Sequence, residues 1–284
     1  MLKLDDIRKQ GSGPLTPTQK RVMDFVLKRP EEVVFLTASR LALRLDLSDT
    51  SIVRLAQALG YDGYPDLQRH LRRLVQDRLV TVGRLGETAK RAETEEDIFR
   101  NVLLRDAGNL ARTVEDTDLK SFRGVVESLR DAERVFVIGL RSTNCLASFL
   151  STALKFLRKD VVQLLPGKGE MWEELTDLGP QDVVVGFSFP RYTRITVEVI
   201  MYAREMGARV VAVTDSELSP LAGSADWVLT VPYEIDSYME SFTAALSLVN
   251  AIVTALAFKN RENTIETLRE MEESWAARGV YWED

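Results

Sequence analysis

Five short β-branched runs, separated by helical segments, constrain the fold of this 284-residue chain more than any other feature. The runs cover residues 135–138, 161–165, 183–187, 210–214 and 227–231. Continuous apolar strands of this kind are covered on both faces, which is typical of a parallel sheet. The intervening segments, such as residues 144–157 and 193–206, have helical spacing and supply the crossover connections. We therefore expect an α/β domain with a doubly wound parallel sheet.

A different pattern occupies residues 36–64, where two short amphipathic segments are joined by a tight polar turn. Thr37 and Ser48 stand at the two positions where an N-cap residue is expected, and Gly60 follows the second apolar face as a stop signal. This arrangement is typical of a helix-turn-helix, whose second helix presents its first residues to base edges in the major groove. Two ordinary helices of an unrelated bundle are the alternative.

A helix-turn-helix in this position predicts an all-helical N-terminal domain that binds double-stranded DNA. The candidate DNA-binding residues are Thr37, Arg40, Ser48, Thr50, Ser51, Arg54, Tyr61 and Tyr64. The helix after Tyr64 carries Arg69, Arg72 and Arg73, which either contact the DNA backbone or form a solvated helix face.

The distribution of charge agrees with this assignment, although the whole chain is acidic. The chain has 37 Lys and Arg against 43 Asp and Glu, a net charge of −6. Residues 1–80 contain 14 basic and 10 acidic residues, a net charge of +4, which leaves 23 against 33, or −10, for residues 81–284. A basic module can pair with phosphates while an acidic remainder avoids nonspecific association with DNA.

The length of the chain favours two domains. We expect a helix-turn-helix domain over residues 1–80, a linker and connecting helix over 81–117, an α/β ligand-binding domain over 118–262 and a helical tail over 263–284. No run approaches the length of a membrane-spanning helix, and the first ten residues lack the apolar core of a signal peptide, which predicts a cytoplasmic protein without a membrane partner. Cys145 stands alone and is expected as a buried helix residue.

Two loops at the predicted carboxyl ends of strands contain candidate ligand-binding residues. The first is residues 139–143 and the second is residues 188–193. Each places hydroxyl side chains at a helix N-terminus, where free amides and the helix dipole attract an anion, and ligands of such sheets bind beyond the carboxyl ends of the strands. The loops therefore predict a phosphate site, and plain N-capping by Ser and Thr is the alternative.

The whole chain resembles the RpiR (MurR/RpiR) family of bacterial transcription regulators. Residues 15–67 are similar to its N-terminal DNA-binding domain, and residues from about 120 to 260 resemble its sugar isomerase (SIS) domain, with the motifs VFVIGLRST, DVVVGFSFPRYT and ARVVAVTDSELSPLAGSAD and a Glu240-Ser241 pair before a long helix. The resemblance implies a regulator that binds an operator as a homodimer or homotetramer and senses a phosphosugar. The implied ligand-binding residues are Arg141, Ser142, Thr143, Ser188, Arg191, Thr193 and Glu240.

The chain departs from the family pattern at two arginines. The phosphate loop of the family usually reads Ser-x-Ser-Gly-x-Thr, and in this register Pro190 replaces the second Ser and Arg191 replaces the Gly. Arg141 stands where the family often has a second glycine. Because glycine tolerates positive φ, we do not expect arginine to take over its backbone role. We expect the guanidinium groups to bind a strongly anionic ligand, such as a phosphorylated sugar acid; salt bridges and loss of phosphosugar binding are the alternative.

An enzymatic role finds little support in the sequence. The only histidine, His70, lies in the N-terminal domain, so Glu240 is the main candidate base for a sugar-phosphate isomerase in the α/β domain. No Cys or His cluster has metal-ligand spacing. We expect no catalytic residues, no metal and no cofactor. The apolar helix over residues 238–260 and the aromatic tail that ends in Tyr281 and Trp282 are candidate contacts between subunits.

Overall fold

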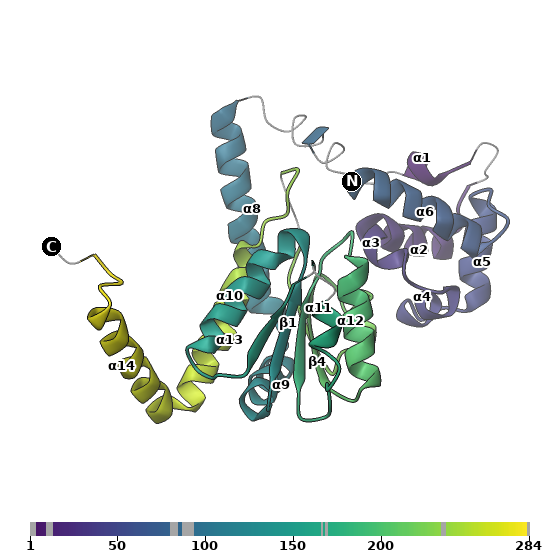
Figure 1. The fold of residues 1–284 in the computed structure, drawn as a ribbon. Helices are drawn as coiled ribbons and strands as arrows, with labels where there is room; N and C mark the ends of the chain where they lie inside the picture. The colour runs from purple at the N-terminus through teal and green to yellow at the C-terminus, as the bar shows by residue number, and fades with distance from the viewer. Residues whose placement is uncertain are drawn as a thin grey trace. The chain divides into compact units, whose positions relative to one another are not determined.

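The computed structural model describes residues 4–9, 14–79, 85–86, 94–165, 167, 170–233 and 237–282. The chain divides into two compact units, Met1–Glu93 and Thr94–Asp284, and each is considered by itself (Figure 1). Of the predicted linker, residues 81–84 and 87–93 lie outside the described residues. The predicted connecting helix belongs to the second unit, where it packs on the α/β domain.

The described part of the first unit is helical. Its helices are α1 (Leu4–Ile7), α2 (Pro17–Lys28), α3 (Pro30–Val33), α4 (Ala38–Arg44), α5 (Asp49–Ala58) and α6 (Tyr64–Leu79). A capping box begins α2, because the Thr16 side chain accepts from the Gln19 amide and the Gln19 side chain accepts from the Thr16 amide. Fully buried side chains from α2, α4, α5 and α6 form the core, among them Val22, Leu41, Ile52 and Leu71.

The second unit contains a parallel five-stranded sheet, which confirms the expected α/β class. The strands are β1 (Val135–Gly139), β2 (Val161–Leu164), β3 (Val183–Phe187), β4 (Arg209–Thr214) and β5 (Trp227–Thr230). Their order is β2-β1-β3-β4-β5, with all four pairings parallel. The order reverses between β1 and β3, so the crevice at the carboxyl ends of these two strands is the topological switch point where ligands of such sheets bind.

Helices cover both faces of this sheet. They are α8 (Glu95–Asp116), α9 (Leu119–Asp131), α10 (Asn144–Lys155), α11 (Glu170–Glu173), α12 (Arg194–Glu205), α13 (Thr243–Lys259) and α14 (Arg261–Ala277), with short 3-10 turns at Arg141–Thr143 and Ala222–Ser224. Val135 and Val137 face a core with α9, α10 and α13, whereas Phe136 and Ile138 face a second core with α12. Alternate residues of β1 thus point to opposite apolar layers, which explains its uninterrupted apolar sequence.

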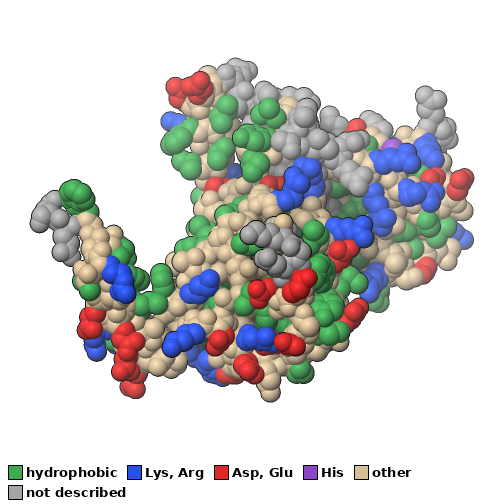
Figure 2. All heavy atoms as spheres, in the orientation of Figure 1, with side chains coloured by type: hydrophobic (Ala, Val, Ile, Leu, Met, Phe, Trp, Pro, Cys, Tyr) green, Lys and Arg blue, Asp and Glu red, His purple; other side chains and the backbone are tan. Residues whose placement is uncertain are grey.

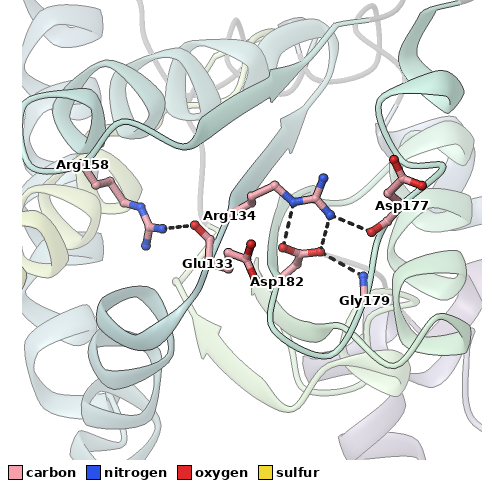
Figure 3. Close-up of polar contacts among 6 residues, drawn as sticks. All are labelled: Glu133, Arg134, Arg158, Asp177, Gly179 and Asp182. Carbon is pink, nitrogen blue, oxygen red and sulfur yellow. Dashed lines mark hydrogen bonds and ion pairs between the residues drawn. The ribbon is translucent and has the colours of Figure 1, made fainter.

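An ion pair joins the amino ends of β1 and β3 on the side opposite the switch point (Figure 3). Arg134 donates to both carboxylate oxygens of the buried Asp182, at 3.0 and 2.7 Å. Asp182 also accepts from the Gly179 amide at 2.9 Å. Burial alone would raise the pKa of the Asp182 carboxyl, but the hydrogen bonds and charge of Arg134 and the Gly179 amide lower it overall. The guanidinium of Arg158 donates to the carbonyls of Leu129 and Ala132 at 2.8 Å and so caps the end of α9.

The C-terminal helices differ from the sequence prediction at their boundaries. The helix predicted over residues 238–260 begins only at Thr243, so Glu240 and Ser241 precede it. The next helix starts at Arg261, after a bend of 106°. Across the described ranges no single helix is long and apolar enough to cross a membrane, and α13 and α14 reach that length and hydropathy only as a bent pair.

Candidate functional site

The recognition helix of the predicted helix-turn-helix is α5, which follows α4 after a four-residue turn. Thr37 caps α4, because its side chain accepts from the Arg40 amide at 3.3 Å. The turn contains Asp46 at φ 53°, a left-handed conformation that Asp tolerates better than most residues. Ser48 has the backbone geometry of an N-cap residue without the side-chain cap, since its hydroxyl bonds instead to Ser51 Oγ at 3.0 Å.

The exposed face of α5 presents a small set of side chains. Thr50 and Arg54 are exposed and lie one helical turn apart, and Ser51 is half-buried beside them. The backbone carbonyl of Arg54 accepts a hydrogen bond from the Gln19 side chain of α2 at 3.3 Å, which joins α5 to α2. The side chain of Arg54 remains exposed to solvent. Arg40 is exposed on α4. Thr50, Ser51, Arg54 and Arg40 are thus accessible to solvent, and their role in DNA binding stays a prediction.

Basic side chains also gather on α6 (Figure 2). Arg69, Arg72 and Arg73 are all exposed, and blue basic side chains lie beside the purple histidine in this view. Arg69 pairs with Asp66 at 3.3 Å, and Arg72 Nε donates to Val34 O at 3.0 Å. Arg69 and Arg72 are therefore partly engaged within the domain, and Arg73 is exposed beside them.

Tyr61 and Tyr64 are core residues, which corrects their assignment to the DNA interface. Both are at most 4 % exposed. The Tyr61 hydroxyl donates to Ile7 O at 2.6 Å, and the Tyr64 hydroxyl donates to Leu36 O at 2.9 Å. Burial, and then the nearby Asp66 charge, raise the pKa of Tyr61 to about 12, and burial raises that of Tyr64 further. An aromatic residue beside a turn has the same sequence pattern whether it faces solvent or the core.

In the second unit, the two predicted ligand loops lie side by side at the switch point. Adjacent β1 and β3 place Gly139 opposite Phe187 in the parallel register. Thr143 is buried, and its hydroxyl donates to Leu140 O at 2.9 Å and to Phe187 O at 3.1 Å, which ties the first loop to the end of β3. A Cβ on Gly139 would lie 2.7 Å from Thr143 O, so the return of this loop requires glycine.

Arg141 and Arg191 both adopt the left-handed backbone conformation, with φ of 59° and 74°. The expectation that arginine could not take over the backbone role of the family's glycines is therefore wrong. Among the described residues, only Asp46 shares this property outside glycine. Such a conformation costs about 1–3 kcal/mol for a non-glycine residue and persists where the surroundings enforce it, as at ligand sites. The backbone keeps the glycine-like path, and two guanidinium side chains are added to it.

The remaining loop residues divide into supports and accessible groups. Ser188 is buried, and its hydroxyl accepts from the Thr193 amide at 3.2 Å, so it supports the second loop. Thr193 occupies the N-cap position of α12 without a side-chain cap and is half-buried, as is Ser142. Arg141 and Arg191 are exposed. Arg141, Arg191, Ser142 and Thr193 are thus the solvent-accessible members of the two loops, and their role in ligand binding stays a prediction.

Glu240 approaches the second loop through an aromatic cluster that the sequence did not reveal. Tyr233 donates to Glu240 Oε1 at 3.2 Å, and its ring stacks on Phe189 with centroids 5.7 Å apart. Phe189 also contacts Phe242 at 5.7 Å. The sequence carried one usable signal, since Tyr233 closely follows β5 and so lies at the same carboxyl edge as the loops.

A second contact missed from sequence holds the loop residue next to Arg191. Tyr192 donates to Asp215 Oδ1 at 2.7 Å, and Asp215 directly follows β4. Thr214 donates to the same carboxylate oxygen at 3.1 Å. The loops after β1, β3, β4 and β5 thus meet at one edge, as the parallel topology dictates.

Cys145 differs from its prediction, because it is exposed on α10 rather than buried. Its thiol donates to Ser142 O at 3.2 Å, and partial desolvation raises its pKa, which disfavours a nucleophilic thiolate. Within the described part of the chain, no group of three or more His, Cys, Asp or Glu side chains could hold a metal ion.

Comparison with known proteins agrees with the two-part organisation. Residues 1–77 match the helix-turn-helix domain of the rpiR family, and residues 128–255 match the SIS domain. The sugar isomerase domain of the RpiR transcription factor from Sphaerobacter thermophilus is 30% identical, with a TM-score of 0.59 over 61% of this chain and 97% of that one. The chain belongs to the RpiR family.

Two further relatives extend over more of the chain. An HTH-type transcriptional regulator of Haemophilus influenzae is 27% identical over 221 residues, which are 76% of this chain and 75% of that protein. The Vibrio vulnificus NanR protein, solved in complex with ManNAc-6P, has a TM-score of 0.65 at 21% identity and covers 96% of this chain and 98% of its own. This RpiR-family chain therefore combines the helix-turn-helix and SIS domains of a transcription regulator.

Proposed function

We propose that this RpiR-family regulator binds operator DNA through α5 and that an anionic phosphosugar at the β1/β3 switch point changes its affinity for the operator. The observation that carries the proposal is the pair of loops in which Arg141 and Arg191 hold glycine-like backbone conformations beside Ser142 and Thr193. Free amides at the start of α12 and two guanidinium groups then face one ligand. The complex of NanR with ManNAc-6P supports a phosphosugar as the class of ligand.

The two arginines favour a ligand with more negative charge than a simple sugar monophosphate. A planar guanidinium binds phosphate or carboxylate through two parallel hydrogen bonds. We therefore infer that the site binds a phosphorylated sugar acid, with a phosphate at one end and a carboxylate at the other. It binds this ligand more tightly than a sugar phosphate of the same length that lacks the carboxylate. Glu240 is suited to accept hydrogen bonds from sugar hydroxyls rather than to contact either anionic group.

Calorimetric titration with matched sugar phosphates and phosphorylated sugar acids tests the ligand site. We expect Arg191→Ala and Arg141→Ala each to weaken binding by about tenfold or more, because a hydrogen bond to a charged group contributes about 1.5–3 kcal/mol. Arg130→Ala is the matched control, since Arg130 pairs with its neighbour Asp131 on the surface. If neither the wild type nor Arg191→Ala bound any member of the two panels, the ligand assignment would be overturned.

Binding to a promoter fragment from its own gene tests the DNA surface. Arg54→Ala should weaken specific binding by about 1–3 kcal/mol, because it removes a side chain placed to read a base edge. Arg73→Ala should weaken binding to all sequences alike and lower the slope of log K against log salt by about 0.9, since it removes a phosphate contact. Ligand affinity should be unchanged in both variants. If Arg54→Ala lowered both affinities together, its assigned role would be wrong.

An isomerase activity is the second candidate function, because Glu240 is held at the ligand edge by Tyr233. The second unit contains no histidine to complete an acid/base pair, which disfavours proton transfer between adjacent carbons. Assays with aldose and ketose phosphates separate the two candidates. Turnover that is lost in Glu240→Gln would establish catalysis in place of sensing alone.

We also propose that the regulator acts as a homodimer or homotetramer. Paired helix-turn-helix units read two half-sites about one helical turn of DNA apart. A cytoplasmic location and double-stranded DNA as the partner follow from this role.

A further inference from the structure

The connecting helix α8 packs on the α/β domain through Leu110 and is also joined to α13 by a side-chain hydrogen bond. Asp106 Oδ2 accepts a hydrogen bond from Thr243 Oγ1, at the first residue of α13, at 2.8 Å. One and two turns further along the same face of α8, the polar residues Asn109 and Thr113 are buried. Arg112 donates to Asn109 Oδ1 at 2.8 Å and the Thr113 hydroxyl donates to Asn109 O at 2.9 Å, both within α8, whereas the bond of Asp106 joins α8 to α13.

The position of Thr243 brings this contact close to the ligand edge. Glu240, which accepts from Tyr233, lies three residues earlier in the chain, and Ser241 Oγ accepts from the Thr243 amide at 3.4 Å. Phe242, immediately before Thr243, contacts Phe189 in the second ligand loop. A short chain of direct contacts therefore leads from the loop that carries Arg191 to the side chain that holds α8.

The amino end of α8 lies at the start of the second unit, where the first unit is attached. The helix begins at Glu95, the second residue of the second unit, so a shift of α8 along α13 moves the point at which the first unit is attached. Its amino-terminal half carries the largely exposed Phe99 and Leu104, whereas its carboxyl-terminal half carries the buried Asn109 and Thr113. The Asp106–Thr243 contact lies between these two groups of residues.

We propose that the Asp106–Thr243 hydrogen bond is the contact through which occupancy of the ligand site sets the position of α8 and hence DNA affinity. The inference rests on the proposed function, because it requires that the site bind a phosphosugar. Ligand that draws Glu240 and the residues after it toward the arginines moves Thr243, and Asp106 follows or releases it. Coupling between two such sites is typically a change of 5- to 150-fold in affinity.

The test measures the ratio of operator dissociation constants with and without ligand, using saturating ManNAc-6P and 6-phosphogluconate as separate probes. The variants are Thr243→Val, which is isosteric and lacks the hydroxyl, and Asp106→Ala. Thr254→Val is the matched control on α13, because the Thr254 hydroxyl donates within its own helix to Asn250 O at 2.8 Å. We expect the ratio to approach one in both test variants and in the double variant alike, and to stay within twofold of wild type in the control.

Hydrogen exchange provides a readout that does not depend on ligand. Amides of residues 95–116 should exchange at least fivefold faster in Thr243→Val than in Thr254→Val, with the sheet unchanged. A wild type that responds to ligand and a Thr243→Val variant that responds equally would overturn the inference and leave the proposed function standing. A wild type whose operator affinity ignores every probe would instead overturn the proposed function. Unchanged exchange of α8 in Thr243→Val would also overturn the inference, because the contact would then not hold the helix.

Discussion

Arg141 and Arg191 combine a left-handed backbone conformation, which glycine adopts most easily, with a charged guanidinium side chain. Their φ values of 59° and 74° keep the loop path that glycine would give. Steric contact between Cβ and the carbonyl makes this region costly for L-residues, by about 1–2 kcal/mol each. Selection of arginine at strained positions is easiest to explain if the guanidinium contributes something that glycine cannot.

Replacement of Arg191 by glycine and by alanine separates these contributions. Both substitutions remove the guanidinium, so both should weaken ligand binding to the same extent. Only glycine relieves the backbone strain, and we expect Arg191→Gly to be about 1 kcal/mol more stable to urea unfolding than Arg191→Ala. Tryptophan fluorescence is the suitable signal, because all four tryptophans lie in the second unit. Equal stability of the two variants would show that the loop relaxes away from the left-handed conformation.

The buried Tyr61 hydroxyl predicts a stability effect without a direct DNA effect. Tyr61→Phe removes the hydrogen bond to Ile7 O and should lower the stability of the first unit by about 1 kcal/mol. Operator affinity at a temperature where the variant is folded should stay near wild type, in contrast to Arg54→Ala.

Because burial raises the pKa of Tyr61 to about 12, the neutral side chain stabilises the folded first unit below pH ~10. This contribution is lost as the pH rises through 12. Hydrogen exchange of residues 14–79 checks the stability of the first unit, and binding to the promoter fragment checks the operator affinity.

At the scale of elements, the strands were predictable and the start of α13 was not. The central strands β1 and β3 are buried on both faces, so their uninterrupted apolar sequences have one interpretation. Residues 238–242 are compatible with a helix, but Glu240 is bound by Tyr233 and Phe242 by Phe189. Tertiary contacts thereby override local propensity, and they involve partners that sequence spacing cannot pair.

The Arg134–Asp182 pair is the element-scale contact with the clearest consequence for stability. Asp182→Asn removes the charge and one of the two hydrogen bonds to Arg134, and it should lower the stability of the second unit by about 2 kcal/mol at pH 7. The lowered pKa of Asp182 means that this contribution is present above pH ~4 and is lost as the pH falls through the folded-state value. Urea unfolding at several pH values should show the two proteins converging in acid.

Asp131→Asn is the matched control for this substitution. Asp131 pairs with Arg130 at 2.7 Å, but both side chains are over 40 % exposed. Surface pairs of this kind contribute little, so the control should remain within about 0.5 kcal/mol of wild type. If Asp131→Asn lowered the free energy of unfolding as much as Asp182→Asn, burial of the ion pair would not explain its contribution to stability.

For the whole molecule, sequence patterns predicted the two-part organisation but not how the loops assemble. The helix-turn-helix and the α/β class follow from periodicity, whereas the strand order β2-β1-β3-β4-β5 depends on crossovers that periodicity does not specify. That order alone makes the loops after β1 and β3 neighbours. Tyr233 and Asp215 were missed for the same reason, because their role arises only when four strand ends meet at one edge.

Exposed apolar residues on α13 lead to a prediction about assembly. Phe258 is 75 % exposed and Leu246 39 %, on the helix that fills one core of the second unit. Exposed large apolar side chains of this kind are typical of a contact between subunits. We expect Phe258→Glu to shift the protein toward monomer in sedimentation velocity, whereas Leu119→Glu, at a leucine of α9 that is 64 % exposed, should sediment as wild type. Monomers present one half-site reader at a time, so operator affinity should fall by up to 10²–10⁴-fold as the effective concentration of the second reader is lost. Unchanged sedimentation of Phe258→Glu would place the subunit contact elsewhere on the molecule.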